Sequence, residues 1–306
     1  MAFLPKYRPS STLALFVIVL TAVSFGLPGE PAEITYRTNV DEVRLTFAAT
    51  DQNNHAVATL EAGDFAVVDN DLIVRNFRSF SRADYTRLEL AILIDSSESI
   101  SPRFRQEVAD VLELLSRTGG VPDQNVSLFS FHGSQPAQLC AGDCRTSRAS
   151  DRLPSAQAGG LTPLFDSVVF TSEFLARHAD PQAKKIMILF SDGEDTVSRN
   201  SFHDAANVAV TNNVQIYCID FGSPSSRGAA VLFAFAGSSG GRYLPAQDGA
   251  VKALNAILED FRASYTVSYR LPNRAAGFHP VRILPTHDLT LQFRSRSGYY
   301  YTDNVR

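Results

Sequence analysis

The sequence predicts an α/β fold with a doubly wound, mostly parallel sheet and flanking β segments at both termini. Two observations support this prediction. From about residue 88 to residue 262, apolar runs of strand length alternate with segments of helical periodicity, which is the pattern of successive βα units. Residues 90–94 form an uninterrupted run of Leu, Ala and Ile, which suits a strand that is covered on both faces.

The chain is expected to have four segments. Residues 1–26 are a signal peptide or N-terminal anchor, residues 27–87 an N-terminal β segment, residues 88–262 the α/β domain and residues 263–306 a C-terminal β segment. The 306 residues, of which 44% are hydrophobic, suffice for one large core with small additions. Because the termini of a domain often lie close together, we expect the two β segments to pack together as a small accessory module.

The N-terminal residues have the order of a secretory signal. Lys6 and Arg8 precede an apolar run over residues 13–23, and small residues including Ser24 follow it. The run is shorter than the ~20 residues of a membrane-spanning helix, so we expect cleavage after Ser24 and an exported protein that is periplasmic, secreted or envelope-anchored. An uncleaved anchor stays open, because residues up to Leu27 extend the apolar run. Membrane contact is expected only through this segment.

Charge and cysteine usage narrow the class of protein. The formal net charge is -4 and the Lys and Arg residues form no basic stripe, so nucleic-acid binding is not expected. Cys140 and Cys144 lie in a polar segment, where an oxidising compartment favours a local disulfide. A metal site built on this pair is the competing interpretation, although no second Cys/His pair lies nearby in the sequence. Cys218, inside an apolar run, is expected to be a buried thiol.

The N-terminal β segment carries three strand signals. Residues 42–49 alternate between apolar and polar side chains, which is the period of a half-buried strand. Residues 65–68 and 72–74 flank a short polar loop, which predicts a hairpin. Residues 75–87 are expected to form a polar connector.

In the α/β domain, each apolar run predicts a strand and each amphipathic stretch predicts a helix. Strands are expected at residues 90–95, 126–131, 185–190, 214–221 and 241–244. Helices are expected from Pro102 to Leu115, after a possible N-cap at Ser101 and up to Gly119 and Gly120, and at residues 164–175, 202–211, 228–236 and 251–261. The long polar segment between residues 132 and 163 is expected to be a functional loop. After residue 264, strands are expected at residues 265–269, 281–284, 289–293 and 299–301.

Two of the predicted strands end in acids. Asp95 closes the first strand and is followed by Ser97 and Ser99, and Asp192 follows a later strand. Because the carboxyl ends of parallel strands lie at one edge of a sheet, these side chains are expected to meet, with Thr162 in a Gly-rich loop able to reach them. Oxygen-only ligands with few carboxylates suit Mg²⁺ better than Zn²⁺. These five residues are therefore the candidate metal ligands.

Each candidate ligand also has a simpler interpretation. Asp95 or Ser99, taken alone, would be a cap of the following helix. Taken together, the five positions favour a metal site, and the alternative is a degenerate site that keeps the fold and has lost the ion.

Five positions in three separated loops resemble the metal-ion-dependent adhesion site of von Willebrand factor type A domains. They are Asp95, Ser97 and Ser99 after a hydrophobic strand, Thr162 in a Gly-rich loop, and Asp192 followed by Gly193 after a later strand. The resemblance covers roughly residues 88–262 and implies a Rossmann-like domain. It also implies that the serines and the threonine contact the ion directly or through water and that the aspartates act largely through water. A Glu or Asp carboxylate of a partner protein would fill the open position. The implied ion is Mg²⁺, or another divalent cation such as Mn²⁺ or Ca²⁺.

The flanks resemble an exported bacterial subgroup of that family. The similarity lies in residues 60–70 and 294–300, and members of the subgroup carry a β segment on each side of the domain. Glu98 departs from the family, which often has glycine at this position. Its side chain either points to solvent or crowds the ion and weakens capture of an acidic partner, and the sequence leaves both open.

The predicted function is therefore metal-dependent, adhesion-type protein binding in the cell envelope or exterior. The alternative is a structural or assembly component of an envelope complex, in which the metal site is incidental or degenerate. An enzyme is not expected, because the sequence has no Gly-x-Ser-x-Gly nucleophile elbow, no Walker loop and no dinucleotide-binding fingerprint.

Overall fold

The computed structural model describes residues 42–82, 88–100, 102–117, 121–133, 135–145, 159–180, 182–246 and 250–302. The predicted signal peptide or anchor and the predicted helix caps at Ser101, Gly119 and Gly120 lie outside these ranges. Within them, no helix is both long and apolar enough to cross a membrane.

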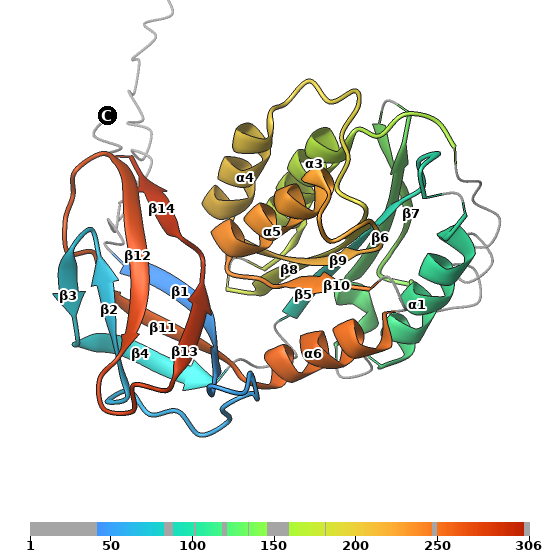
Figure 1. Ribbon diagram of the computed structural model, residues 1–306. Coiled ribbons are helices and arrows are strands. Elements are labelled where there is room, and N and C mark those ends of the chain that lie inside the picture. Colours follow the sequence, from blue (N-terminus) through green and yellow to red (C-terminus); the bar gives the residue numbers. More distant parts are fainter. Residues whose placement is uncertain are drawn as a thin grey trace, which may run out of the picture. The chain divides into compact units, whose positions relative to one another are not determined.

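The α/β domain is built on a central sheet with the strand order β10-β9-β8-β5-β6-β7 (Figure 1). Its strands are β5 (Leu88–Asp95), β6 (Val126–His132), β7 (Gln135–Ala141), β8 (Lys184–Ser191), β9 (Val214–Asp220) and β10 (Tyr243–Pro245). All neighbouring pairs are parallel except β6 and β7. This confirms the predicted mostly parallel sheet.

Helices cover both faces of this sheet (Figure 1). On one face lie α1 (Phe104–Arg117) and α6 (Val251–Arg262), and on the other lie α3 (Leu164–His178), α4 (Phe202–Thr211) and α5 (Arg227–Ser239). Side chains of β5 alternate between the two cores, with Leu90, Ile92 and Ile94 facing α1 and α6, and Ala91 and Leu93 facing the other layer. Burial on both faces is the reason that this strand is apolar throughout.

Strands from both ends of the described chain form two further sheets, which we call the β module. One has the order β13-β1-β11-β4 and the other β14-β12-β2-β3. Their strands are β1 (Glu42–Thr50), β2 (Phe65–Asp69), β3 (Leu72–Val74), β4 (Phe77–Arg82), β11 (Ser264–Arg270), β12 (Gly277–Pro285), β13 (Gln292–Ser295) and β14 (Gly298–Tyr301). Both sheets contribute to one apolar core, in which the rings of Phe47 and Phe65 lie 5.1 Å apart.

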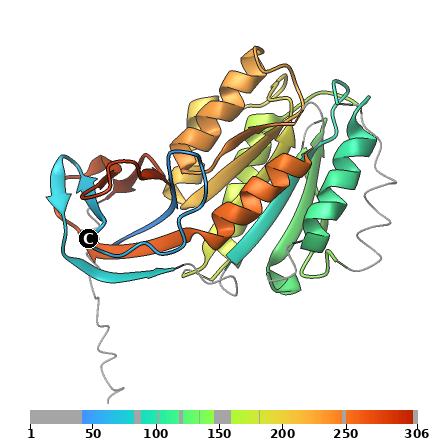
Figure 2. The same ribbon diagram turned by 60° about the horizontal axis from the view of Figure 1, so that its bottom comes forward.

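The N-terminal and C-terminal strands pair with each other inside the β module. β1 is antiparallel to β11, and β2 is antiparallel to β12. β11 follows α6 after one residue, so the chain passes directly from the α/β domain into the module (Figure 2). The module therefore needs residues from both sides of the α/β domain.

Two expectations about connecting segments are wrong. Residues 75–87 include strand β4 instead of a connector, because β4 pairs with β11 across a bulge near Ser268. That bulge brings Phe77 and Phe80, which are three residues apart, toward the same core, so the period of two is hidden in the sequence. Residues 135–141, expected to be part of a long loop, form β7, an edge strand whose short sequence has Pro136 near its start and no regular alternation to reveal it.

One expectation about the β segments is confirmed and one is shifted along the chain. The hairpin of β2 and β3 is confirmed, and Asn70 and Asp71 at its turn have φ values of 48° and 63°, as type I′ turns require. The strand expected at residues 289–293 lies at residues 292–295 instead.

The amino ends of the central strands contact the β module through buried polar groups, and we call this side the docking edge. The Nζ of Lys184 donates to the Oγ of Ser264 at 2.5 Å. The Asp260 carboxylate lies 2.6 Å from the guanidinium of Arg294. Gly240 (φ 80°) fits only because it has no side chain, since a Cβ there would lie 2.3 Å from the backbone of Ser295.

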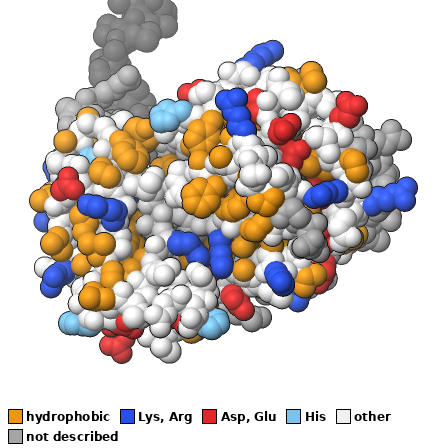
Figure 3. Space-filling view, in the orientation of Figure 1, with side chains coloured by type: hydrophobic (Ala, Val, Ile, Leu, Met, Phe, Trp, Pro, Cys, Tyr) orange, Lys and Arg blue, Asp and Glu red, His pale blue; other side chains and the backbone are white. Residues whose placement is uncertain are grey.

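The surface visible in Figure 3 carries interspersed charges of both signs. Lys and Arg side chains do not gather into one basic stripe on this face.

Candidate metal centre

Three loops meet at the carboxyl ends of β5 and β8, which are neighbours in the sheet. We call this side the ion edge and define it by residues 95–99, 159–162 and 191–196. The backbone of the second loop is hydrogen-bonded to the first, from Gly159 N to Ser96 O (2.8 Å) and from Glu98 N to Gly160 O (3.1 Å).

The second loop is also bonded to the third. The backbone N–H of Thr162 donates to the Oγ1 of Thr196 at 2.8 Å, and the N–H of Thr196 donates back to the carbonyl of Thr162 at 2.9 Å. The three loops thus form one connected rim, as the spacing of the candidate ligands predicts.

Asp95 is the most buried acid of this rim. It is fully buried, and its Oδ1 accepts from the backbone N–H of Ser97 at 2.9 Å while its Oδ2 accepts from the Oγ of Ser191 at 2.7 Å. Burial, together with the nearby charge of Asp192, raises the pKa of Asp95 to about 6, against the opposing effect of these hydrogen bonds. A bound cation would favour the ionised form.

The hydroxyl candidates lie at different depths. The Oγ atoms of Ser97 and Ser99 are 3.3 Å apart, and Ser97 is buried while Ser99 is exposed. Thr162 is buried and Asp192 is partly buried, with its Oδ1 accepting from the N–H of Glu194 at 3.1 Å. The rim therefore offers oxygen atoms that run from the interior to the surface.

Gly193 fixes the backbone beside Asp192. Its φ is 78°, and a Cβ at this position would lie 2.2 Å from the carbonyl oxygen of Gly228, at the start of α5. Only glycine fits this contact, so the loop that carries Asp192 packs tightly on α5.

The three loops carry three further acids that are not candidate ligands. Glu98 and Glu194 are exposed. Asp195 accepts from the N–H of Phe165 at 3.2 Å and from the Oγ of Ser198 at 2.5 Å, so it holds the first turn of α3 instead of facing solvent alone.

Sequence reasoning missed three residues at this edge. Ser191 orients Asp95, and Thr196 holds the Thr162 loop. Asp220 is a buried acid at the end of β9, and its carboxylate accepts from the hydroxyl of Tyr243 at 2.6 Å. The signal for Asp220 was present, because it ends an apolar run in the same way as Asp95.

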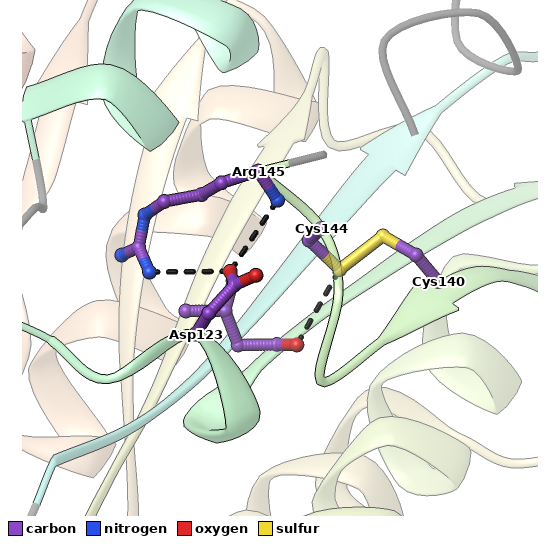
Figure 4. The surroundings of a disulfide bond; sticks show 5 residues. Asp123, Cys140, Cys144 and Arg145 are labelled. Atoms are coloured by element: carbon purple, nitrogen blue, oxygen red, sulfur yellow. Dashed lines mark hydrogen bonds and ion pairs between the residues drawn. A yellow bond between two sulfur atoms is a disulfide. The ribbon is translucent and has the colours of Figure 1, made fainter. Parts of the chain in front are cut away.

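The predicted disulfide joins Cys140, in the edge strand β7, to Cys144 (Figure 4). Beside it, Arg145 donates to the carboxylate of Asp123 at 3.2 Å. In the described part of the chain, the two cysteines and Asp143 form a close group of three potential ligands, but the two sulfurs are bonded to each other and are not thiolates. Cys218 is a buried free thiol, as predicted.

The donor set at the ion edge fits a divalent cation with oxygen ligands. Two acids and three hydroxyls lie on one rim, and the charge of Asp192 contributes to the raised pKa of Asp95. Carboxylates and hydroxyls that leave room for water are the ligands that Mg²⁺ prefers.

The sequence model of the von Willebrand factor type A domain matches residues 89–255, which is more than half of the chain. Among curated proteins, none matches this chain. An aerotolerance-related membrane protein from Bacteroides fragilis has a similar fold at 18% identity and a TM-score of 0.46, over 57% of this chain and 98% of that one.

Two further solved structures are similar at the same level. Manganese-loaded TRAP protein of Plasmodium vivax has 17% identity and a TM-score of 0.44, over 73% of this chain and 98% of its own. Proximal thread matrix protein 1 from the mussel byssus has 15% identity and a TM-score of 0.47, over 63% of this chain and 49% of its own.

Proposed function

The chain belongs to the von Willebrand factor type A domain family, and on that premise we propose that its ion edge binds a divalent cation and captures a partner protein through it. One observation carries the proposal. Hydrogen bonds connect three loops that are far apart in the sequence, and these loops bring five oxygen-bearing residues to one edge of the sheet. They are Asp95, Ser97, Ser99, Thr162 and Asp192.

The chain's own residues divide the work. Ser97, Ser99 and Thr162 supply hydroxyl oxygens, and Asp95 and Asp192 supply negative charge. Ser191 holds the carboxylate of Asp95 in place through its 2.7 Å hydrogen bond. Mg²⁺ fits this set best, and Mn²⁺ or Ca²⁺ would satisfy the same atoms. The ion, when bound, offers a coordination position to a Glu or Asp side chain of the partner.

We place this activity outside the cytoplasm. The disulfide between Cys140 and Cys144 supports an oxidising compartment, and the basic and apolar N-terminal residues have the pattern of a secretory signal. We propose no catalytic role, and turnover of simple esters or phosphoesters by the purified protein would contradict that.

Calorimetric titration with Mg²⁺ tests the proposed site. Asp95→Ala and Thr162→Ala are each expected to weaken Mg²⁺ binding at least about a hundredfold, because each removes one oxygen donor or charge from the rim. Asp71→Ala is the control, since this exposed acid lies on the hairpin of the β module. Unchanged Mg²⁺ binding by both rim variants would show that the site is wrong.

A second candidate function is assembly through the β module, with the ion incidental. It is favoured by the edge strand β3, where Leu72 and Ile73 are exposed. The two candidates differ in their response to a chelator. Capture of a partner from the native envelope should be lost in EDTA if the ion edge binds it, and should survive EDTA but not Ile73→Lys if β3 binds it.

A further inference from the structure

Strand β2 of the β module is apolar on both of its faces. Residues 65–68 are all apolar and buried, but only Phe65 and Val67 belong to the core of the module. Because side chains alternate along a strand, Ala66 and Val68 face the outer side of the sheet β14-β12-β2-β3. The strand β5 is apolar throughout because helices cover both of its faces, whereas this outer side keeps large apolar side chains exposed.

Larger side chains of the neighbouring strands stand on either side of Ala66 and Val68. Val68 is paired with Ile73 of β3, and Ala66 is paired with Leu284 of β12. Ile73 is 65% exposed and Leu284 is 47% exposed. Between them the surface is hollowed into a groove of about 390 Å³, which we call the module groove. This volume is within the range of pockets that bind ligands, about 300–1,000 Å³.

The charged groups of the module groove are basic. Of the described residues that line it, Arg75 and His287 are those that can carry a charge, and both are exposed. Arg282, on the same strand as Leu284, is paired with Asp71 at 3.6 Å. Arg75 has no ion-pair partner in the described part of the chain. The groove therefore combines an apolar floor with a positive charge that no described acid balances.

We infer that the module groove binds an extended segment of a partner protein that carries apolar side chains and an acidic residue. The apolar side chains would cover Ala66 and Val68 between the two walls, and the acid would pair with Arg75. Figure 3 shows hydrophobic side chains over this part of the β module, with Lys and Arg side chains beside them. This inference goes beyond capture through the ion and gives the second candidate function its surface and the chemistry of its partner.

A short fluorescent peptide tests this binding. In the probe, Val alternates with Thr around one central Glu, so that the apolar side chains lie on one face of the extended segment. The control peptide has Lys in place of Glu. Fluorescence anisotropy is measured with the whole protein in EDTA, which removes any contribution of a bound ion. We expect the Glu peptide to bind at least about tenfold more tightly than the Lys peptide.

Three variants examine the charge and the shape of the groove separately. Arg75→Glu is expected to reverse the preference, so that the Lys peptide binds about tenfold more tightly than the Glu peptide. Ala66→Leu fills the groove without a change of charge and is expected to weaken binding of the Glu peptide at least about tenfold. Arg177→Glu, at an exposed arginine of α3, is the control and is expected to leave both affinities within about twofold of the wild type.

Several results would overturn the inference. Equal binding of the two peptides by the wild type, or binding of neither, would exclude an acidic apolar segment as the occupant. Should Ala66→Leu not fold, the exposed Ile73 takes its place, and unchanged binding by Ile73→Lys would contradict the role of the groove. Self-association in sedimentation experiments that Ile73→Lys abolishes would make a second copy of this chain the occupant.

The same measurements keep this inference apart from the proposed function. Asp95→Ala is expected to bind the Glu peptide as the wild type does, because the module groove contains no residue of the ion edge. Weaker binding by Asp95→Ala, or binding of the peptide only when Mg²⁺ is present, would place the peptide at the ion edge and overturn the inference. Loss of the peptide site alone would leave the proposed Mg²⁺ site unaffected.

Discussion

The two edges of the central sheet treat buried charge in opposite ways. At the docking edge, Asp260 lies beside Arg294 and within 3.7 Å of Arg242, so acid meets base. At the ion edge, burial and the nearby charge of Asp192 raise the pKa of Asp95, and no base pairs with its carboxylate among the hydrogen bonds it accepts. The comparison teaches that the docking edge places its buried acid beside bases of the same chain, whereas the proposed cation site lies where acids are gathered at the other ends of the strands.

Loss of one charge at the docking edge should have the largest effect. Asp260→Ala leaves two arginines without their acid, and we expect it to lower the free energy of unfolding by about 3 kcal/mol in urea denaturation. Mg²⁺ affinity should not change, because the ion edge lies at the other ends of the strands. As a matched control, Asp260→Leu combined with Arg294→Met should cost much less. An equal loss in the double variant would argue against the ion pair as the cause.

Loss of one charge at the ion edge should have the opposite effect and raise the free energy of unfolding. The pKa of Asp95 is raised to about 6 in the folded protein. Between about pH 4 and pH 6 the folded protein therefore binds a proton that the unfolded chain has lost, so the free energy of unfolding falls as the pH rises. Above about pH 6 the ionised Asp95 keeps the folded protein less stable by this amount. In EDTA at pH 7.5, Asp95→Asn is expected to raise the free energy of unfolding by about 2 kcal/mol. A lower free energy of unfolding for Asp95→Asn, measured by urea denaturation, would show that the ionised carboxylate does not destabilise the metal-free protein.

Lys184 makes the docking edge sensitive to pH. Burial lowers the pKa of Lys184 to about 7, so between pH 7 and about 10 the unfolded chain binds a proton that the folded protein does not. Stability contributed by this residue therefore rises with pH, by about 1 kcal/mol per unit. The difference in unfolding free energy between the wild type and Lys184→Met, measured from pH 7 to 9, should show this slope. Parallel curves would contradict it.

An exposed contact between β14 and α4 should contribute least to the free energy of unfolding. The hydroxyl of Tyr300 donates to Asn207 at 3.2 Å across an exposed contact between β14 and α4. Tyr300→Phe is expected to change the free energy of unfolding by no more than about 0.5 kcal/mol, because water replaces the lost partner. A decrease in the free energy of unfolding above about 1 kcal/mol would show that water does not replace this hydrogen bond.

Local patterns made most elements predictable. The apolar run at residues 90–94 predicted the central strand, because a strand covered on both faces leaves no room for polar side chains. The turn between β2 and β3 was equally readable, since Asn70 and Asp71 accept a positive φ. β4 and β7 were not predicted. A bulge hides the period of two in β4, and β7 is an edge strand with a proline and no regular alternation.

The five candidate ligands could be proposed from the sequence because their chemistry depends on residue type and on position after a strand. Residues that act on them from elsewhere could not be found in this way. Ser191 is the last residue of an apolar strand, and Thr196 lies in the polar loop that follows it. Their roles depend on distances across the fold.

The sequence by itself determined the α/β class and the strand ends that carry Asp95 and Asp192, and it left the pair Cys140 and Cys144 open between a disulfide and a metal site. These follow from periodicity and residue type over short stretches. Only the tertiary structure decided which charges are paired, because pairing depends on contacts between distant segments such as Asp260 with Arg294. Contacts of the same kind brought the hydroxyl of Ser191 to the carboxylate of Asp95.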